Sequence, residues 1–346
     1  MSALLRPGPE PPGWDEAVAA AGTGGFFQTT RWARLLRVLR GSRAWYLQAR
    51  NGQGPAARCL VLQEGLLCDR LRRVSFGRFL VPALGGRLPV LSWQNGPLVA
   101  GGSPATCDEV LDQVDAVART TGALAVRFAP FPATGAADLG PSLAARGYRA
   151  RRCATFWVDL QSDYEARLDR SVRKNVRRCR EQGVWAGPVA PHEYPQYYRL
   201  QQAFRRATGL PGFSFRDFLL HAEHLGPVRC LFAARWRGRL LAGLGVLAWN
   251  GLLVEVEAAT NPLCYEERLH AQDLLKVEIM AWGRERGFGA FDLAGVAVEP
   301  QDAKEEGIRR FKAKFGGQYL EFDAYERRAS GWRARLARGL APGAWS

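Results

Sequence analysis

The stretch GIRRFKAKFGG, residues 307–317, and the apolar run FDLAG, residues 291–295, decide how this sequence folds. Together they predict a strand, a glycine-containing loop, a short basic helix and a Gly-Gly stop. Four cations of the basic helix stand among phenylalanines that can anchor it to a core. A solvated helix usually mixes both signs of charge, so this segment indicates a site for an anionic group. The alternative is an ordinary amphipathic helix.

The size and charge of the chain limit what it can be. At 346 residues it is too long for one small core, so we expect a first domain at 1–158, a second at 159–330 and a basic tail at 331–346. The net charge is +15, and only five of the 48 basic residues are lysine. Arginine binds phosphate and carboxylate as a planar fork, so the excess favours an anionic partner. A codon bias toward arginine would give the same total.

The cysteines, histidines and apolar runs argue against several classes of protein. The seven cysteines form no C-x-x-C pair and the four histidines are scattered, so we expect reduced thiols and no metal site. The N-terminus lacks the apolar segment of a signal peptide, and the longest apolar run, 240–249, is too short to span a bilayer. We expect a cytoplasmic monomer whose basic tail can rest on the inner face of an anionic membrane. A frayed tail is the alternative.

The two halves of the chain predict the same order of elements: helix, helix or loop, β-meander, helix, strand, helix, strand. This order resembles the GNAT acyltransferase fold. The expected class is therefore α/β (α+β), with two tandem GNAT-like domains whose mixed sheets are flanked by helices. In the second half the predicted helices are 164–182, 195–207 and 269–286, and the predicted strands are 229–235, 240–248, 252–258, 291–293 and 318–325.

Three motifs carry a more specific resemblance. They are FFQTTRWARLL at 26–36, SVRKNVRRCREQGV at 171–184, and FDLAGV followed by EEGIRRFKAKFGGQYLEF at 305–322. These motifs resemble the Fem-type (FemABX) peptidyltransferases and the BioF2-like acyltransferase group. The resemblance implies transfer of an amino acid from aminoacyl-tRNA to the stem peptide of a peptidoglycan precursor, in cell wall biogenesis. It implies no cofactor, metal or covalent enzyme intermediate.

The resemblance also assigns roles to residues of the C-terminal and opening motifs. It implies that Lys312 stabilises the negative charge that builds on the carbonyl oxygen during aminolysis of the donor ester. Phe311 and Phe315 lie four apart and are expected to face the core, which points Lys312 away from it. The candidates for substrate binding are Arg309, Phe311, Lys314, Gly316, Gln28 and Trp32.

The basic helix at 164–182 is the candidate contact for tRNA. Its cations surround one apolar stripe, and a phosphate contact of this kind positions a nucleic acid without reading its sequence. The alternative is a solvated helix face. The family pattern R-x-N-x-R-R falls on part of this helix, so the candidate residues are Arg173, Lys174, Asn175, Arg177 and Arg178.

Carboxylates on two predicted strands are the candidate acids and bases. Glu255 and Glu257 lie two apart, so they are expected to share one face of a strand. Either this face is solvated, or Glu257 takes a proton from the attacking amine. Asp292 ends a predicted strand, where α/β sites often gather. It is either a catalytic residue or a cap for the loop that follows.

Two other functions stay open. The first is CoA-dependent N-acylation of a small-molecule or polysaccharide-pathway amine. The loop at 259–268 argues against it, because it contains no glycine to cradle a pyrophosphate and carries two glutamates. The second is an inactive tRNA-binding module, which would bind RNA with a steep salt dependence and turn nothing over.

Overall fold

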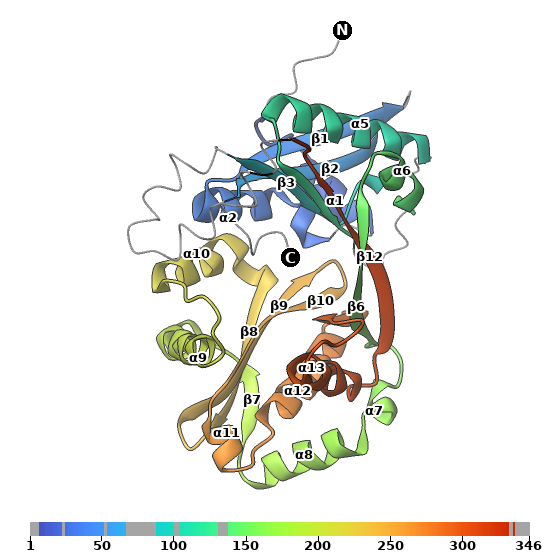
Figure 1. Ribbon diagram of the computed structural model, residues 1–346. Coiled ribbons are helices and arrows are strands. Elements are labelled where there is room, and N and C mark those ends of the chain that lie inside the picture. Colours follow the sequence, from blue (N-terminus) through green and yellow to red (C-terminus); the bar gives the residue numbers. More distant parts are fainter. Residues whose placement is uncertain are drawn as a thin grey trace. The chain divides into compact units, whose positions relative to one another are not determined.

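The computed structural model describes residues 7–22, 25–51, 54–66, 88–99, 104–130, 138–331 and 335. The chain forms two compact units (Figure 1). Unit 1 holds Met1–Arg152 and Phe322–Ser346, and unit 2 holds Cys153–Glu321. The chain therefore passes from one unit to the other twice. The domain ranges expected from the sequence ran straight along the chain, whereas here the C-terminal segment returns to unit 1.

Unit 1 is a mixed sheet with helices on both faces. Alternate residues of its second strand point to opposite sides: Cys59 and Val61 pack with one cluster, and Leu60 and Leu62 with another. Among the residues of this unit that the structure describes, only β3 and β5 pair in parallel. The strands are β1 (Arg43–Asn51), β2 (Gly54–Gly65), β3 (Pro89–Gln94), β4 (Leu98–Val99), β5 (Ala125–Ala129) and the end of β12 (Gln318–Arg328); the helices are α1 (Trp14–Ala20), η1 (Phe26–Gln28), α2 (Thr30–Arg40), α5 (Pro104–Thr121) and α6 (Gly140–Ala145).

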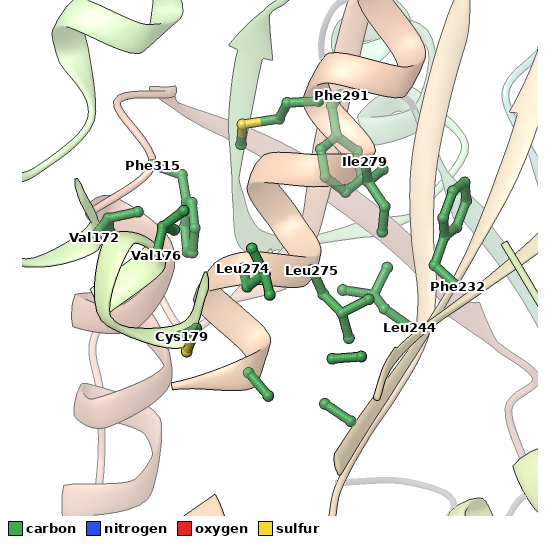
Figure 2. Packing of buried hydrophobic residues seen from close by; sticks show 14 of the residues in the cluster. Val172, Val176, Cys179, Phe232, Leu244, Leu274, Leu275, Ile279, Phe291 and Phe315 are labelled. Carbon is green, nitrogen blue, oxygen red and sulfur yellow. The ribbon is translucent and has the colours of Figure 1, made fainter. Parts of the chain in front are cut away.

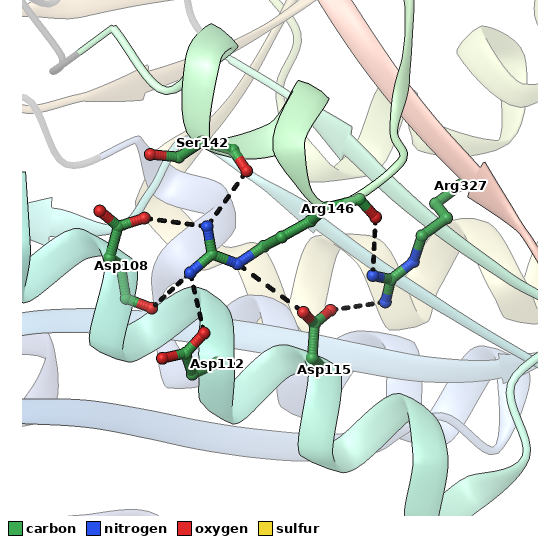
Figure 3. A network of polar contacts seen from close by, with 6 residues as sticks. All are labelled: Asp108, Asp112, Asp115, Ser142, Arg146 and Arg327. Carbon is green, nitrogen blue, oxygen red and sulfur yellow. Dashed lines mark hydrogen bonds and ion pairs between the residues drawn. The ribbon is translucent and has the colours of Figure 1, made fainter.

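A polar network fastens the end of β12 into unit 1 (Figure 3). Arg146 donates to the carboxylates of Asp108 at 2.9 Å and Asp112 at 2.8 Å. Asp115 accepts from Arg327 of β12 at 2.5 Å, and Arg327 also donates to the backbone oxygen of Arg146 at 3.1 Å. Charge-assisted bonds of this kind are stronger than neutral ones. They join α5, the end of α6 and the last strand.

Unit 2 is built on a β-meander that is flanked by three further strands. The predicted hairpin at Asn250-Gly251 is confirmed: both residues have positive φ, 49° and 78°, and Trp249 pairs with Leu252. The sheet order is β6-β11-β10-β9-β8-β7, and of the described pairs in this order only β10 and β11 run in parallel. The strands are β6 (Arg149–Asp159), β7 (Trp185–Pro188), β8 (Arg229–Trp236), β9 (Arg239–Trp249), β10 (Leu252–Thr260) and β11 (Ala290–Val296).

Helices cover both faces of this sheet as well. Phe232 and Ala234 of β8 pack with α8 and α12, whereas Leu231 and Ala233 pack with α9 and α10. In Figure 2, Phe315 lies beside Val172 and Val176 of α8. The helices are α7 (Tyr164–Arg167), α8 (Arg170–Glu181), η2 (Pro191–Glu193), α9 (Tyr194–Ala207), α10 (Phe215–Leu225), η3 (Gly226–Val228), α11 (Leu263–Glu266), α12 (Ala271–Glu285) and α13 (Ala303–Ala313).

The helix expected at 164–182 is wrong as one element, because it is broken into α7 and α8. Leu168 has an extended backbone, with φ −58° and ψ 135°, and Asp169 accepts a hydrogen bond from the Ser171 N–H at 2.7 Å. An aspartate in this position satisfies a free N–H at the start of the new helix. Helix α10 was not expected. Its capping box, formed by Ser214 and Asp217, is a signal that the sequence does carry.

Candidate active site around Lys312

Lys312 lies on the last turn of α13 and is buried. Only 9% of the residue is exposed, and Nζ donates to the backbone oxygens of Ala294 at 3.1 Å and Gly295 at 3.0 Å. The expectation that this side chain points away from the core is therefore wrong. Phe315 is fully buried and Phe311 half-buried. The lysine turns inward because backbone oxygens of β11 are presented to it.

A bulge in β11 presents those oxygens. Asp292 pairs with Trp157 and Gly295 with Thr155, so three steps along β11 oppose two along β6. The bulge places Ala294 in the left-handed region, with φ 63°. This conformation is uncommon for a residue with a side chain. Such bulges often re-aim groups beside active sites, and here the ammonium of Lys312 is held by two carbonyl dipoles.

Asp292 is buried at the same bulge and is 4% exposed. Its Oδ1 accepts hydrogen bonds from the Thr155 hydroxyl and from the Ala294 N–H, the latter at 2.8 Å. Burial raises the pKa of Asp292, opposed by these hydrogen bonds and by the charge of Lys312. Burial also lowers the pKa of Lys312, while the charges of Glu255 and Asp292 oppose that shift. Each group thus helps the other to stay ionised.

A second buried ion pair completes the cluster. Lys276 of α12 donates to Oε2 of Glu255 on β10, with side-chain exposures of 2% and 11%. Among the described residues, no hydrogen bond is made to the other oxygen, Oε1. Glu255 is the largest charge influence on Lys312. Two cations and two carboxylates, drawn from α12, α13, β10 and β11, therefore meet in one place, and we call these four residues the charge cluster.

The position of the charge cluster follows from the sheet. β10 and β11 pair in parallel only from Leu252 with Ala290 to Val254 with Asp292. Directly after this point each strand carries a bulge, one after Asp292 and one between Glu255 and Glu257. Where parallel strands stop pairing, their backbone polar groups and side chains can contact other side chains or a ligand. The cluster occupies this point.

The expectation that Glu255 and Glu257 share a face is wrong. The bulge between them turns Glu257 toward α9 on the opposite side of the sheet, where the Tyr197 hydroxyl lies 3.3 Å from it. Arg229 donates to both of its carboxylate oxygens, at 2.9 and 3.1 Å. Glu257, expected to accept a proton in catalysis, is thus a paired carboxylate outside the charge cluster.

The remaining residues of the C-terminal motif hold α13 in place. Arg309 donates to the Val298 backbone oxygen at 2.7 Å, and its guanidinium lies over the Tyr319 ring at 4.9 Å. Phe311 packs edge-on against Phe315, with ring centroids 5.3 Å apart, and the Lys314 ammonium lies 5.8 Å from the Phe311 ring. Phe311 and Lys314 are half-buried, so each keeps some accessible surface. Gly316 packs tightly against Arg167.

The two candidates of the opening motif lie in unit 1. Gln28 is fully buried. Its side-chain N–H groups donate to the backbone oxygens of Leu60 and of Gln94, the latter at 2.6 Å, and its side-chain oxygen accepts from the Leu60 N–H. Gln28 is thus hydrogen-bonded within the fold and has no accessible surface for a substrate, which corrects the expectation. Trp32 packs edge-on with Phe26 and Phe27, at 6.1 and 5.1 Å between ring centroids.

The basic helix α8 keeps its cations on the surface. Arg173, Lys174, Arg177 and Arg178 are all exposed. Arg177 lies 3.6 Å from Glu181 one turn away, an arrangement worth little in water. Asn175 departs from the expected phosphate contact: its Nδ2 donates to Asp273 of α12 at 2.7 Å, and so joins two helices. Burial raises the pKa of Asp273.

Two residues of the site, Lys276 and Thr155, were not expected from the sequence. Lys276 belongs to the charge cluster, and Thr155 donates a hydrogen bond to Asp292. Within the described residues, no group of three or more His, Cys, Asp or Glu could hold a metal ion. In the same part of the chain, no helix has both the length and the apolar character needed to cross a bilayer. The tail at 331–346 lies outside the described residues except for 331 and 335.

Comparison with known proteins identifies the fold. No family model matches the chain, and no curated protein sequence matches it. Among solved structures, FemX shares 13% identity over 94% of this chain and 97% of its own, with a TM-score of 0.74. L-PGS from Bacillus licheniformis shares 14% identity over 93% and 96%, with a TM-score of 0.57.

A tandem GNAT protein from the clavulanic acid biosynthesis pathway also matches. It shares 14% identity over 92% of this chain and 94% of its own, with a TM-score of 0.54. At these identities the likeness shows the fold. The expected mixed α/β architecture of two GNAT-like halves is confirmed, and so is the resemblance to Fem-type proteins at the level of the fold.

Proposed function

We propose that this chain is an aminoacyltransferase of the Fem type. It transfers an aminoacyl group from aminoacyl-tRNA to an amine, such as that of a peptidoglycan precursor stem peptide, and so serves cell wall biogenesis on the cytoplasmic side of the membrane. The observation that carries the proposal is Lys312, a buried cation held by two backbone oxygens in a fold shared with FemX. A cation fixed in this way needs no reorganisation when negative charge develops beside it.

In the proposed reaction the amine nitrogen attacks the ester carbonyl of the donor. A carbon–nitrogen bond forms, the carbon–oxygen bond to the ribose breaks, and Lys312 stabilises the oxyanion between these events. The amine loses a proton, and the leaving ribose oxygen gains one. Glu255 replaces Glu257 as the proposed proton acceptor, because its Oε1 has no partner among the described residues and it lies in the charge cluster.

The exposed cations of α8 are proposed to contact the phosphates of the tRNA. They form a surface that suits a polyanion, and such contacts orient a nucleic acid without selecting its sequence. Asn175 acts in this proposal by fixing α8 on α12 through Asp273. The contact is electrostatic, so binding should weaken as salt rises.

The start of α12 argues against a CoA donor in unit 2. A pyrophosphate at a helix N-terminus needs free N–H groups and a positive end. Here the buried carboxylate of Asp273 already occupies the first turn. In the preceding loop the Leu263 N–H donates to the Asn261 side chain at 3.0 Å and the Cys264 N–H to the Asn261 backbone oxygen at 2.9 Å. These two N–H groups are therefore already hydrogen-bonded within the loop.

A transfer assay tests the proposed role of Lys312. Total tRNA charged with radiolabelled amino acids is mixed with a peptidoglycan precursor, and the label that leaves tRNA for the precursor is counted. Lys312→Ala should lower kcat by about a hundredfold or more. Lys304→Ala is the matched control, because Lys304 is an exposed lysine on the first turn of the same helix. Full transfer by Lys312→Ala would overturn the assignment.

Binding experiments separate the alternatives. A gel shift comparing charged with uncharged tRNA should show binding of both, with the charged form preferred. Calorimetry with acetyl-CoA should show no heat of binding, whereas clear binding would support CoA-dependent acylation instead. RNA binding with no transfer from any aminoacyl donor would leave only the inactive binding module.

A further inference from the structure

Lys276 is a buried cation whose surroundings connect it to Lys312. Its exposure is 1%, and its ammonium donates to Glu255. The same ammonium lies 5.7 Å from the ring centre of Phe311 and 5.8 Å from that of Phe315. Phe311 directly precedes Lys312 on α13, and Phe315 follows it by three residues, just beyond the end of the helix. Lys276 therefore contacts the strand that carries the proposed proton acceptor and the helix segment that carries the oxyanion-stabilising lysine.

Stability alone is a poor explanation for this arrangement. Taking a lysine and a glutamate out of water costs free energy that their attraction often only offsets, and well-packed apolar residues of similar volume serve as well or better. Cation–π contacts add only about 0.5–2 kcal/mol. Lys276 stands in a mostly apolar stretch of α12, after the buried Leu274 and Leu275 and before the buried Ile279. A function in the charge cluster explains why charged groups stand there.

We propose that Lys276 is a positioning residue: through Glu255 and the rings of Phe311 and Phe315 it holds in place the segment that carries Lys312. The proposal rests on the proposed function, in which Lys312 acts on the donor carbonyl. It adds a residue that touches neither substrate and acts through its neighbours.

The charges that face Lys312 come from every element packed around it. Glu255 on β10 and Asp292 on β11 favour its protonated form, and Lys276 on α12 disfavours it. On α13 itself, Arg309 precedes it by three residues and lies over Tyr319. Removal of Lys276 thus takes away a repulsion, whereas removal of Glu255 takes away the largest attraction. The two changes should move the titration of Lys312 in opposite directions.

Nuclear magnetic resonance of lysine side chains measures this without any substrate. The chain has only five lysines, so protein labelled with 13C at the lysine ε carbon gives five signals. The Lys312 signal is the one missing from Lys312→Arg. We expect the midpoint of its titration to rise in Lys276→Met and to fall in Glu255→Gln, relative to the unaltered chain.

Arg235→Met is the matched control. Arg235 is also a buried cation, paired with Glu193 at 2.7 Å and lying 4.5 Å from the Trp185 ring centre, but it is not among the charges that act on Lys312. It should leave the midpoint unchanged. An unchanged midpoint in folded Lys276→Met, or a shift of equal size in Arg235→Met, would overturn the proposal. If Lys276→Met does not fold, Glu255→Gln decides, because a midpoint that fails to fall contradicts the cluster.

Turnover gives the second readout, in the same transfer assay with radiolabelled aminoacyl-tRNA. Lys276→Met should lower kcat by about a hundredfold with little change in KM, as expected for misplaced catalytic groups. Lys276→Arg, which keeps the charge, should recover part of the loss. Equal kcat in Lys276→Met and the unaltered chain would refute the positioning role. Absence of transfer by the unaltered chain would instead refute the proposed function, and the titration would still decide how Lys276 acts on Lys312.

Discussion

Gly316→Ala should unfold the end of the C-terminal motif at a cost that can be worked out from its surroundings. Gly316 has φ 68°, in the left-handed region. A Cβ added there would lie 2.6 Å from both the Cβ and the backbone oxygen of Arg167. Part of this obstacle is backbone, so it cannot rotate away. The turn between α7 and α8 and the end of α13 would have to separate.

Two terms add to give the expected magnitude. A left-handed backbone costs a residue with a side chain about 1–2 kcal/mol, and forcing an extra carbon into a packed site costs about 1–3 kcal/mol. We therefore expect Gly316→Ala to lower the free energy of unfolding by about 2–5 kcal/mol. This cost falls on the helix end that carries Lys312.

Gly307→Ala is the control on the same helix. A Cβ at this position would meet nothing within 4 Å. Because alanine is a better helix former than glycine, this change should raise the free energy of unfolding by about 0.8–1 kcal/mol. The two substitutions add the same methyl group to one short motif and should have opposite signs.

Urea denaturation followed by circular dichroism measures both changes, and the midpoints should lie on either side of the unaltered chain. A loss below about 1 kcal/mol for Gly316→Ala would show that the clash argument is wrong. If stability were unchanged while KM for the donor rose, Gly316 would be a substrate contact, as the motif first suggested.

Three further predictions concern charge. Since burial lowers the pKa of Lys312, the folded chain releases this proton at a lower pH than the unfolded chain. The free energy of unfolding should therefore rise with pH in the alkaline range below about 10.4. Lys312→Met should remove that rise, and urea titrations at several pH values measure both. Arg146→Met should lower the free energy of unfolding, measured by urea denaturation, by about 1–3 kcal/mol, because it leaves acceptors of a partly buried network without a donor. Arg34→Ala breaks an exposed pair with Glu10 and should lower it by less than about 1 kcal/mol. Lys174→Ala with Arg178→Ala should weaken tRNA binding and reduce the slope of log K against log salt by about 1.5 in gel shifts.

Each of these has a distinct failure. The same pH dependence in Lys312→Met and the unaltered chain would remove Lys312 as the source of the alkaline rise. Equal costs for the two arginine variants would mean that the network in unit 1 stabilises no more than a surface pair. For tRNA, the control is Arg239→Ala with Arg268→Ala, two exposed arginines outside α8. An equal change of slope in that control would mean that binding follows total charge and not α8.

The regular elements of unit 2 could be predicted because their signals are local. The apolar strands and the Asn250-Gly251 turn located the meander within two residues at each end. The helix expected at 269–286 is α12, Ala271–Glu285. The break at Asp169 was missed because helical periodicity continues across it, although aspartate is a favoured N-cap residue and here accepts from the Ser171 N–H two residues on.

The candidate site depended on features with no local signal. Counting by two placed Glu255 and Glu257 on one face, and a single inserted residue sends them to opposite faces. Helical spacing pointed Lys312 outward, but the bulge that places Ala294 in the left-handed region offers it the backbone oxygens of Ala294 and Gly295 on β11. Lys276 did leave a trace, as a lone lysine in the apolar run LLKVEIM, yet its partner is 21 positions away.

The return of the C-terminal segment to unit 1 has a consequence for biosynthesis. Unit 2 is one continuous span, whereas unit 1 needs Tyr325–Arg328 to pair with Ala125–Phe128 and needs Arg327 for its network. During translation, all of unit 2 is synthesised before the last segment of unit 1. Unit 1 begins first, but its sheet cannot be completed until the end of β12 has been made. A chain that ends just before residue 322 would therefore contain all of unit 2 and an incomplete sheet in unit 1.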